Sequence, residues 1–272
     1  MATTVVIFSK DRPWQLSEYL RTFYKHCSGI YNFVVLWKSN QYREQYLDVI
    51  KHYSDSKYNA KFIEESEFYK DITNILNNIE YPYTMFGVDD VLWYDYFDIF
   101  DGERTLEQYP DIHVYSYRLH PNIKFCQPAN VFNTIPTFEA IKYGYSYNRS
   151  YGGGDFNYPF EVSASLYRTS DIKNIIVNLD KFNNPNELED RLQFSTLHPQ
   201  YHRNAFNGRR VCSTITINRV QEQYKNPTYD AGVSLDIINN WFGHYQFDTS
   251  KYATELFDRI HIGDFFVRQI TN

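Results

Sequence analysis

Apolar and polar residues follow two different periods in the amino-terminal third of the chain. Continuous apolar runs at residues 5–8, 33–37 and 83–88 are typical of strands that are covered on both faces. In the segments between these runs, apolar residues recur at helical spacing, and Pro13 stands where the first such segment begins. Strands that alternate with helices predict a parallel sheet joined by right-handed crossovers.

The elements predicted for this part are joined by short loops. In order they are strand 5–8, helix 14–26, strand 33–37, helix 41–53, strand 61–64, helix 68–79 and strand 83–88. The chain is therefore expected to belong to the α/β class.

The pattern is less regular after residue 90. Residues 94–100 carry several acids and are expected to form a solvated helix face. Residues 112–118, 160–167 and 211–220 are read as strands, residues 169–179 and 234–241 as helices, residues 187–190 as an acidic helix start, and the glycine-rich residues 148–157 as a mobile loop.

The charge balance argues against a general nucleic-acid-binding protein. Lys and Arg number 27 and Asp and Glu number 33, so the net charge is −6, whereas such proteins carry a basic stripe. No apolar run reaches the roughly 18 residues of a membrane helix, and no signal peptide is recognised. Cys27, Cys126 and Cys212 are widely spaced and odd in number, so we expect reduced thiols and a cytoplasmic location.

Two adjacent carboxylates, Asp89 and Asp90, follow the apolar run at residues 83–88 directly. Carboxylates at the end of a buried strand are costly to desolvate unless a cation or a hydrogen-bond donor pairs with them. Oxygen ligands suit Mg²⁺ or Mn²⁺, and such ions commonly bridge carboxylates to phosphates. The alternative interpretation is that the two acids begin a helix as its cap and first-turn acid.

The loops that follow the predicted strands are mostly polar. They comprise residues 9–12, 38–40, 64–67 and 89–90. Ligands of open parallel sheets bind at the carboxyl ends of the strands, where these loops would meet. The sequence therefore predicts a nucleotide site at this edge of the sheet.

Four motifs in this order resemble the GT-A-fold glycosyltransferases that use nucleotide-diphosphate sugars, in particular family 2-like members of bacteria and large algal viruses. The motifs are Phe8-Ser-Lys-Asp-Arg-Pro13, Phe86-Gly-Val-Asp-Asp90, Phe160-Glu-Val-Ser-Ala-Ser-Leu-Tyr-Arg168 and Asn184-Pro-Asn-Glu-Leu-Glu-Asp190. The second is similar to the DxD-type motif of these enzymes. The resemblance implies one domain over residues 1–272, with a mostly parallel central sheet flanked by helices. Residues 1–100 would be the nucleotide-binding half, and residues 101–272 a smaller acceptor-side half.

The resemblance also implies roles for individual residues. Those expected at the nucleotide are Phe8, Ser9, Lys10, Arg12, Lys38, Asp71 and Asp89. Lys38 stands where this fold often places an acid near the base.

The remaining implied roles belong to the metal and to the proton transfer. Asp90 would bind the metal directly, and Asp89 would bind either the metal or the donor ribose. His261 near the carboxyl terminus is a further candidate metal ligand. Glu189 or Asp190 would be the general base that removes a proton from the acceptor hydroxyl.

These roles imply the transfer of a sugar from a UDP- or GDP-type donor to a hydroxyl of a glycan or glycoprotein. Mn²⁺ or Mg²⁺ would stabilise the charge of the leaving diphosphate. A carboxylate base opposite the leaving group implies inversion, although retention stays open.

Two other classes of function stay open. A sugar-phosphate nucleotidyltransferase shares the parallel sheet and the bound metal, but the loop at residues 9–13 lacks the glycines that such an enzyme uses to bind a triphosphate. A non-catalytic carbohydrate-binding protein would suit the aromatic content of 19%, but such modules are usually all-β.

Overall fold

A nine-stranded sheet forms the centre of the computed structural model, which describes residues 1–193, 202–221, 227–229 and 231–271. In spatial order its strands are β11 (Glu139–Ile141), β12 (Gly144–Asn148), β14 (Arg203–Phe206), β8 (Ile112–Ser116), β13 (Ser165–Arg168), β5 (Tyr83–Val88), β1 (Thr3–Lys10), β3 (Tyr31–Lys38) and β4 (Ala60–Glu64). The four strands from β5 to β4 are parallel. Beyond β5 the sheet is mixed, because β13 is antiparallel to both of its neighbours.

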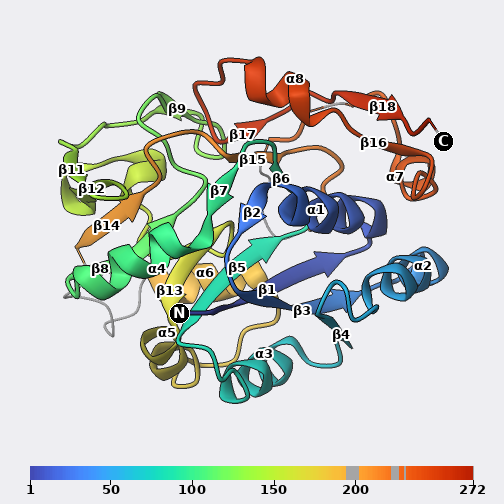
Figure 1. Cartoon of the computed structure of the whole chain (residues 1–272), viewed down its shortest axis with the longest axis horizontal. Coiled ribbons are helices and arrows are strands. Elements are labelled where there is room, and N and C mark those ends of the chain that lie inside the picture. Colours follow the sequence, from blue (N-terminus) through green and yellow to red (C-terminus); the bar gives the residue numbers. More distant parts are fainter. Residues whose placement is uncertain (194–201, 222–226, 230, 272) are drawn as a thin grey trace.

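Helices cover both faces of this sheet (Figure 1). One face packs against α1 (Pro13–His26), α2 (Arg43–Tyr53) and α4 (Ile99–Gln108), and the other against α3 (Phe68–Asn77), α5 (Thr169–Ile176) and α6 (Pro185–Gln193). Side chains of β1 alternate between the two cores, since Val5 and Ile7 face the first and Val6 and Phe8 the second. A strand buried on both faces is mostly apolar, which explains the continuous run at residues 5–8 in the middle of β1.

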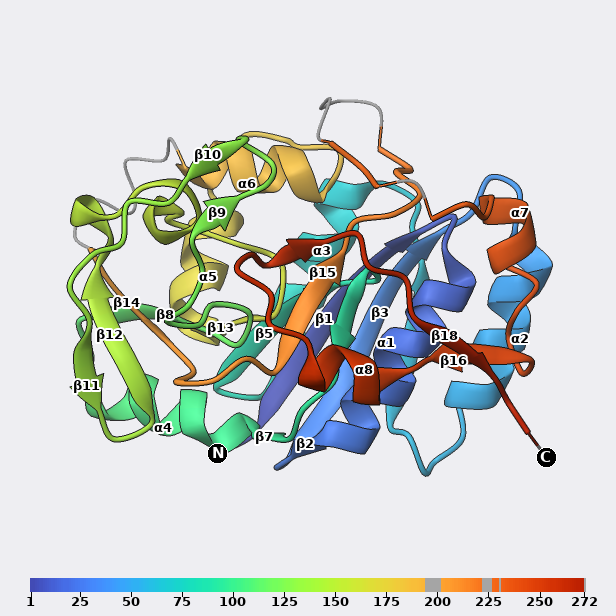
Figure 2. The same cartoon turned by 90° about the horizontal axis from the view of Figure 1, so that it is seen from above.

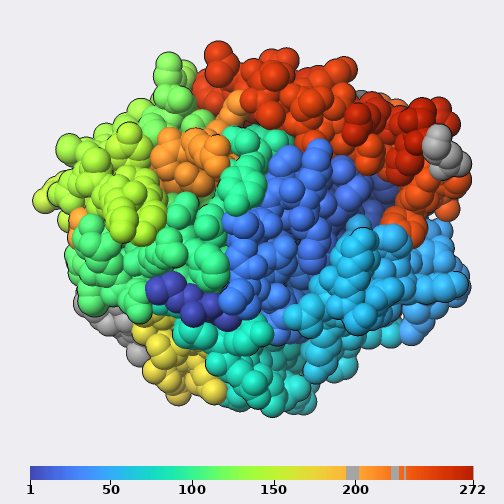
Figure 3. All heavy atoms as spheres, viewed as in Figure 1, coloured from blue at the N-terminus to red at the C-terminus, as the bar shows by residue number. Residues whose placement is uncertain are grey.

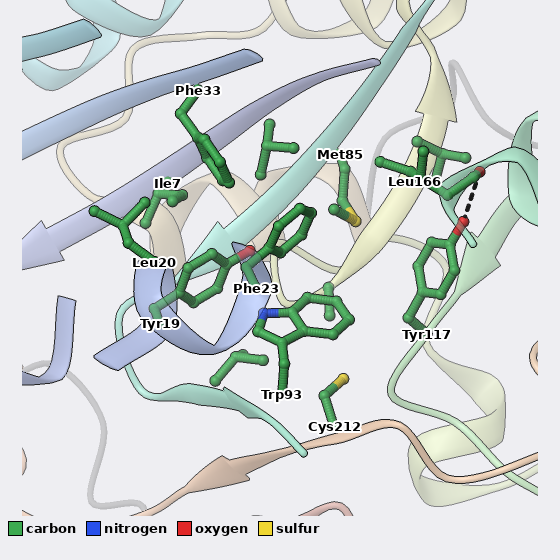
Figure 4. Packing of buried hydrophobic residues seen from close by; sticks show 14 of the residues in the cluster. Ile7, Tyr19, Leu20, Phe23, Phe33, Met85, Trp93, Tyr117, Leu166 and Cys212 are labelled. Atoms are coloured by element: carbon green, nitrogen blue, oxygen red, sulfur yellow. Dashed lines mark hydrogen bonds between the residues drawn. The ribbon is translucent and has the colours of Figure 1, made fainter. Parts of the chain in front are cut away.

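Aromatic side chains dominate the first of these cores. Phe23 of α1 lies with its ring centroid 5.1 Å from that of Trp93, which stacks on Phe97 at 4.3 Å. Figure 4 shows Tyr19 and Phe23 of α1 close to Trp93, and the hydroxyl of Tyr117 donates to the Ile99 carbonyl at 2.9 Å. Many of the aromatic residues are therefore structural.

The carboxyl-terminal segment returns across the molecule to the first helix, as Figures 2 and 3 show. It contributes α7 (Leu235–Ile238), β16 (Tyr245–Phe247), α8 (Thr249–Thr254), β17 (His261–Ile262) and β18 (Val267–Gln269). Trp14 of α1 is fully buried beneath it and donates from Nε1 to the Tyr245 carbonyl at 3.0 Å. β17 pairs with β15 (Cys212–Ile215), which pairs in turn with β6 (Val91–Trp93) directly after the acid pair.

Short strands and 3₁₀ turns complete the described structure. The strands are β2 (Cys27–Ser28), β7 (Phe97–Asp98), β9 (Phe125–Cys126) and β10 (Val131–Phe132), and the turns are η1 (Arg149–Tyr151) and η2 (Gly154–Asn157).

The predicted fold class is confirmed, and the alternation of strands and helices through residue 88 is confirmed element by element. The prediction of a helix face at residues 94–100 is wrong. Strand β7 occupies part of this segment, and Asp98 caps α4 by accepting from the Phe100 N–H at 3.0 Å. Asp95 and Asp98 are three residues apart, as on one face of a helix, but Asp95 lies in a bend and Asp98 caps the start of α4.

Three further predictions are only partly correct. Strand pairing covers residues 165–168 and 212–215, shorter than the segments 160–167 and 211–220 that the alternation indicated. The glycine-rich segment 148–157 contains the two 3₁₀ turns η1 and η2.

Among the described residues, no helix combines the length and apolar composition needed to cross a bilayer.

Candidate active site

A cavity of about 720 Å³ lies at the carboxyl edge of the parallel strands. The loops after β1, β3, β4 and β5 line one side of it, while α6, β15 and β17 contribute to the rest. The expected site residues that line it are Phe8, Ser9, Lys10, Arg12, Lys38, Asp89, Asp90, Glu189 and His261. Residues far apart in the sequence thus meet at the edge where the strand order placed a ligand.

Hydrogen bonds from the end of β1 fix Asp89, and Tyr46 of α2 supports the residues there. Its Oδ2 accepts from the Ser9 hydroxyl at 2.8 Å and from the Lys10 backbone N–H at 3.2 Å. The Tyr46 hydroxyl of α2 lies 2.6 Å from the Ser9 hydroxyl and accepts from the Arg12 backbone N–H at 3.1 Å. Burial raises the pKa of Asp89 to about 7, opposed by the nearby guanidinium of Arg12 and assisted by the charge of Asp90.

The Arg12 side chain bridges the two carboxylates. Its Nη1 lies 2.8 Å from Asp90 Oδ2 and 3.4 Å from Asp89 Oδ1. The acid pair therefore does not start a helix, as one alternative had it, because strand β6 follows it immediately. Instead the two acids share a buried cation inside a cavity.

The carboxylate oxygen that remains free at the acid pair fits a divalent cation whose other ligands are phosphate oxygens. Asp90 Oδ1 is buried and has no hydrogen-bond partner among the described residues. In the part of the chain that the structure describes, no three His, Cys, Asp or Glu side chains cluster closely enough to hold a metal ion. Mg²⁺-type ions commonly use only one or two carboxylates together with substrate phosphates.

His261 is half-buried and lines the same cavity, beside Arg118. Its Nε2 lies 3.1 Å from Nη1 of Arg118, and because a guanidinium only donates, Nε2 must accept and Nδ1 must carry the hydrogen. Burial and the charge of Arg118 hold the pKa of His261 well below its usual value. The lone pair that a metal would need is thus directed at Arg118.

Arg118 also forms a buried ion pair with Glu161 and donates to the Thr214 hydroxyl at 2.6 Å. The Glu161 carboxylate accepts in addition from the Ser165 hydroxyl at 3.1 Å. Both residues line the cavity, so the Arg118 guanidinium is held there with its charge balanced by Glu161.

The outer end of the cavity, after β3 and β4, combines an ion pair with apolar side chains. Lys38 Nζ lies 2.8 Å from Glu65 Oε1, and both residues line the cavity with Leu36 and Phe68. Glu65 therefore supplies an acid beside the position where the sequence offered only Lys38.

Asp71 is not among the residues that line the cavity. Its carboxylate accepts from the backbone N–H groups of Ser66 and Glu67 at 2.7 and 2.9 Å. These bonds satisfy free donors at the start of α3, which is a structural role.

The two candidate bases lie differently. Glu189 of α6 lines the cavity and accepts from the Val162 backbone N–H at 2.8 Å. Burial raises its pKa to about 7, against the opposing effects of that hydrogen bond and of Arg118. Asp190 is absent from the lining, so the structure brings only Glu189 together with the acid pair.

Sequence reasoning missed Arg118 and Glu161 as site residues, and it included Glu65 only as part of the loop at residues 64–67. Arg118 lies two residues after the end of β8, so the rule that polar residues after strands form the site could have found it. Glu161 precedes β13, and nothing in its local sequence indicates that it faces Arg118.

A second hollow of about 670 Å³ lies between the amino ends of β1 and β3 and the segments that precede β4 and β5. Its lining includes Asn32, Asn59, Asn74 and Asn78, and none of the expected site residues. The chemistry of the cavity at the carboxyl edge makes that cavity the candidate active site.

No family model matches the chain. It is similar to the bifunctional glycosyltransferase pgtA of Dictyostelium discoideum, with 30% identity over 97% of this chain and 39% of that protein. It is also similar to the uncharacterized protein MJ1281 of Methanocaldococcus jannaschii, with 31% identity over 39% of this chain and 11% of that protein. The chain thus spans well under half the length of the curated relatives it matches.

Solved structures of the S. aureus protein TarS share the fold. Residues 1–349 of TarS in complex with UDP-GlcNAc match 85% of this chain and 62% of that chain, with a TM-score of 0.51 and 13% identity. A second TarS structure of the same residues matches 78% of this chain and 60% of that chain, with a TM-score of 0.50 and 15% identity. The curated relative confirms the resemblance to glycosyltransferases, and the TarS structures confirm the GT-A-like fold.

Proposed function

We propose that this chain is a glycosyltransferase that moves a sugar from a UDP- or GDP-type donor to a hydroxyl of a glycan or glycoprotein. The observation that carries the proposal is that one cavity is lined both by the acid pair Asp89–Asp90 and by the half-buried carboxylate of Glu189. The similarity to a curated glycosyltransferase over 97% of the chain supports the same class of reaction.

The donor diphosphate would bind beside the acid pair. Asp90 would hold Mn²⁺ or Mg²⁺ through its unpartnered Oδ1, and the diphosphate would complete the coordination. When bound, such an ion neutralises the charge that develops on the leaving group. Arg12 and Arg118 line the same cavity, and their guanidinium groups would donate hydrogen bonds to the phosphate oxygens.

The nucleoside would extend from the acid pair towards the Lys38–Glu65 ion pair. The strands that carry these residues lie in the order β5, β1, β3 and β4, so two strand spacings, about 10 Å, separate the ends of β5 and β3. Lys38 and Glu65 would then face the polar edge of the base, with Leu36 and Phe68 along its apolar faces. In this arrangement residues 1–100 serve the donor and later residues serve the acceptor.

Glu189 would act as the general base. A carboxylate whose pKa is about 7 is partly ionised at neutral pH and accepts a proton more readily than an unperturbed one. Attack by the activated hydroxyl on the face opposite the diphosphate would invert the anomeric centre. His261 would hold Arg118 in place while Nε2 accepts from it, and it becomes a metal ligand only if Arg118 moves away.

A donor screen tests this function. Release of UDP or GDP from a panel of nucleotide sugars is measured with and without Mn²⁺, in the wild type and in Asp90→Asn. The matched control is Asp95→Asn, since Asp95 is a nearby acid paired with Arg209 and outside the cavity. We expect metal-dependent release that Asp90→Asn reduces by about 10²-fold or more and that Asp95→Asn leaves unchanged.

Two results would contradict the proposal. Absence of nucleotide-sugar binding and turnover across the panel would remove the donor site. Release of pyrophosphate from a nucleoside triphosphate and a sugar phosphate would assign the cavity to a nucleotidyltransferase instead.

A further inference from the structure

Arg12 occupies the place where a cation would be held by the acid pair. Its Nη1 lies within 3.4 Å of an oxygen of each carboxylate, and its side chain is only 12% exposed. A divalent ion close to both acids would therefore lie next to a guanidinium, and the two positive charges would repel each other strongly in a buried site.

The other oxygens of the acid pair are also largely committed. Asp89 Oδ2 already accepts from the Ser9 hydroxyl and the Lys10 backbone N–H. Only Asp90 Oδ1 is buried without a hydrogen-bond partner among the described residues. One free carboxylate oxygen is a poor site for a divalent ion unless other oxygens join it.

We propose that Arg12 and the divalent cation are alternative counter-ions of Asp90, so that the cation binds only together with a nucleoside diphosphate and Arg12 transfers from Asp90 to that diphosphate. The inference rests on the proposed function, because it assumes that the diphosphate binds in this cavity. It assigns Arg12 a positioning role that orders the binding of the two ligands.

The loop that carries Arg12 is built to let the side chain move while the backbone stays in place. The Arg12 backbone N–H donates to the Tyr46 hydroxyl at 3.1 Å. The preceding residue, Asp11, accepts from the Asn40 backbone N–H at 2.6 Å, and its carbonyl accepts from Asn239 Nδ2 at 3.0 Å. None of these bonds uses the guanidinium.

The guanidinium has donors to offer a diphosphate. Arg12 Nε is buried and has no hydrogen-bond partner among the described residues, although the residue lines the cavity. A planar guanidinium binds phosphate oxygens in pairs, which a divalent ion beside it does not prevent when both face the same anion. Adding the diphosphate thus removes the repulsion that excludes the cation from the empty cavity.

The test measures Mn²⁺ binding directly, from the electron paramagnetic resonance signal of the free ion, with the full chain and with UDP or GDP as the probe. We expect the wild type to bind Mn²⁺ at least about tenfold more tightly when the nucleoside diphosphate is present. Arg12→Gln should bind Mn²⁺ alone about tenfold more tightly than the wild type and should bind the diphosphate about tenfold more weakly.

Two other variants keep the result interpretable. Arg12→Lys retains the charge, so its affinity for Mn²⁺ alone should stay within about threefold of the wild type. Arg43→Gln makes the same change of net charge at an exposed ion pair with Glu64, outside the cavity, and should not alter Mn²⁺ binding. Mn²⁺ should also raise the melting temperature of Arg12→Gln more than that of the wild type, which shows that the variant is folded.

Equal or weaker binding of Mn²⁺ alone by Arg12→Gln overturns the proposal. So does a wild type that binds UDP or GDP but no Mn²⁺ in any combination, and in that case the donor site itself still stands. If neither UDP nor GDP binds in any variant, the proposed function fails together with this inference.

Discussion

Replacement of Glu189 by Gln tests the assignment of the base most directly. Gln retains an oxygen that can accept the Val162 N–H, which Glu189 accepts at 2.8 Å, so the local structure should be preserved. It removes the group that would take the proton. Loss of a general base typically costs about 10²- to 10⁴-fold in rate, and we expect kcat/KM to fall by that amount.

The pH dependence of the wild type follows from the raised pKa of Glu189. A group with a pKa of about 7 is about 9% ionised at pH 6 and about 91% ionised at pH 8, since each pH unit changes the ratio tenfold. The base acts in its ionised form, so kcat/KM should rise about tenfold between these two pH values. The rise should be much smaller in Glu189→Gln, where Asp89 is the remaining site carboxylate with a pKa of about 7.

The measurement is the initial rate of nucleoside diphosphate release, recorded from pH 5.5 to pH 9 at low donor concentration. Asp190→Asn is the matched control, because it removes the neighbouring carboxylate of the same helix that does not line the cavity. The reasoning is refuted if Glu189→Gln stays within about threefold of the wild type. It is equally refuted if Asp190→Asn loses more activity than Glu189→Gln and takes the pH dependence with it.

Two further predictions concern stability. Arg118→Met leaves the buried Glu161 carboxylate without its partner and should lower the free energy of unfolding, measured by urea denaturation, by about 3–5 kcal/mol. The double variant Arg118→Met/Glu161→Gln should recover more than half of this loss. No recovery would mean that the two charges are not coupled. Glu103 is buried, accepts from the Thr3 hydroxyl at 2.6 Å and has a pKa raised to about 7, chiefly by burial. Its folded form therefore binds the proton more tightly than its unfolded form, and stability is lost as the pH rises from about 4.5 to about 7. Glu103→Gln should accordingly gain about 2.5 kcal/mol relative to the wild type between pH 5 and pH 8, and a difference that does not change with pH would contradict this.

The parallel half of the sheet could be predicted because its signals are local. β1 and β5 are buried on both faces and read as continuous apolar runs, and each is followed at once by polar residues. In a parallel sheet those exits must meet at one edge. This rule alone brought Ser9, Arg12 and Asp89 into one site, although about eighty residues separate them.

The acceptor-side wall could not be predicted in the same way, because its geometry depends on pairings between distant segments. Arg118 meets Glu161 only because β13 inserts antiparallel between β8 and β5. His261 reaches the cavity through a two-residue strand that pairs with β15. A strand of that length has no measurable period, so no pattern of apolar and polar residues could have indicated it.

The local sequence did not show which cation pairs with Asp89 and Asp90. Buried carboxylates after a strand require a cation, and the inference of a metal followed from Asp89 and Asp90 alone. The structure supplies the cation from Arg12, which belongs to the loop beside them. One buried guanidinium against two carboxylates leaves a net negative charge of at most one, small enough for a folded apo cavity. Binding of a dianionic diphosphate to that cavity would be unfavourable without added positive charge. A divalent ion that arrives together with the diphosphate restores the balance, which is the physical reason to expect the two ligands to bind as a pair.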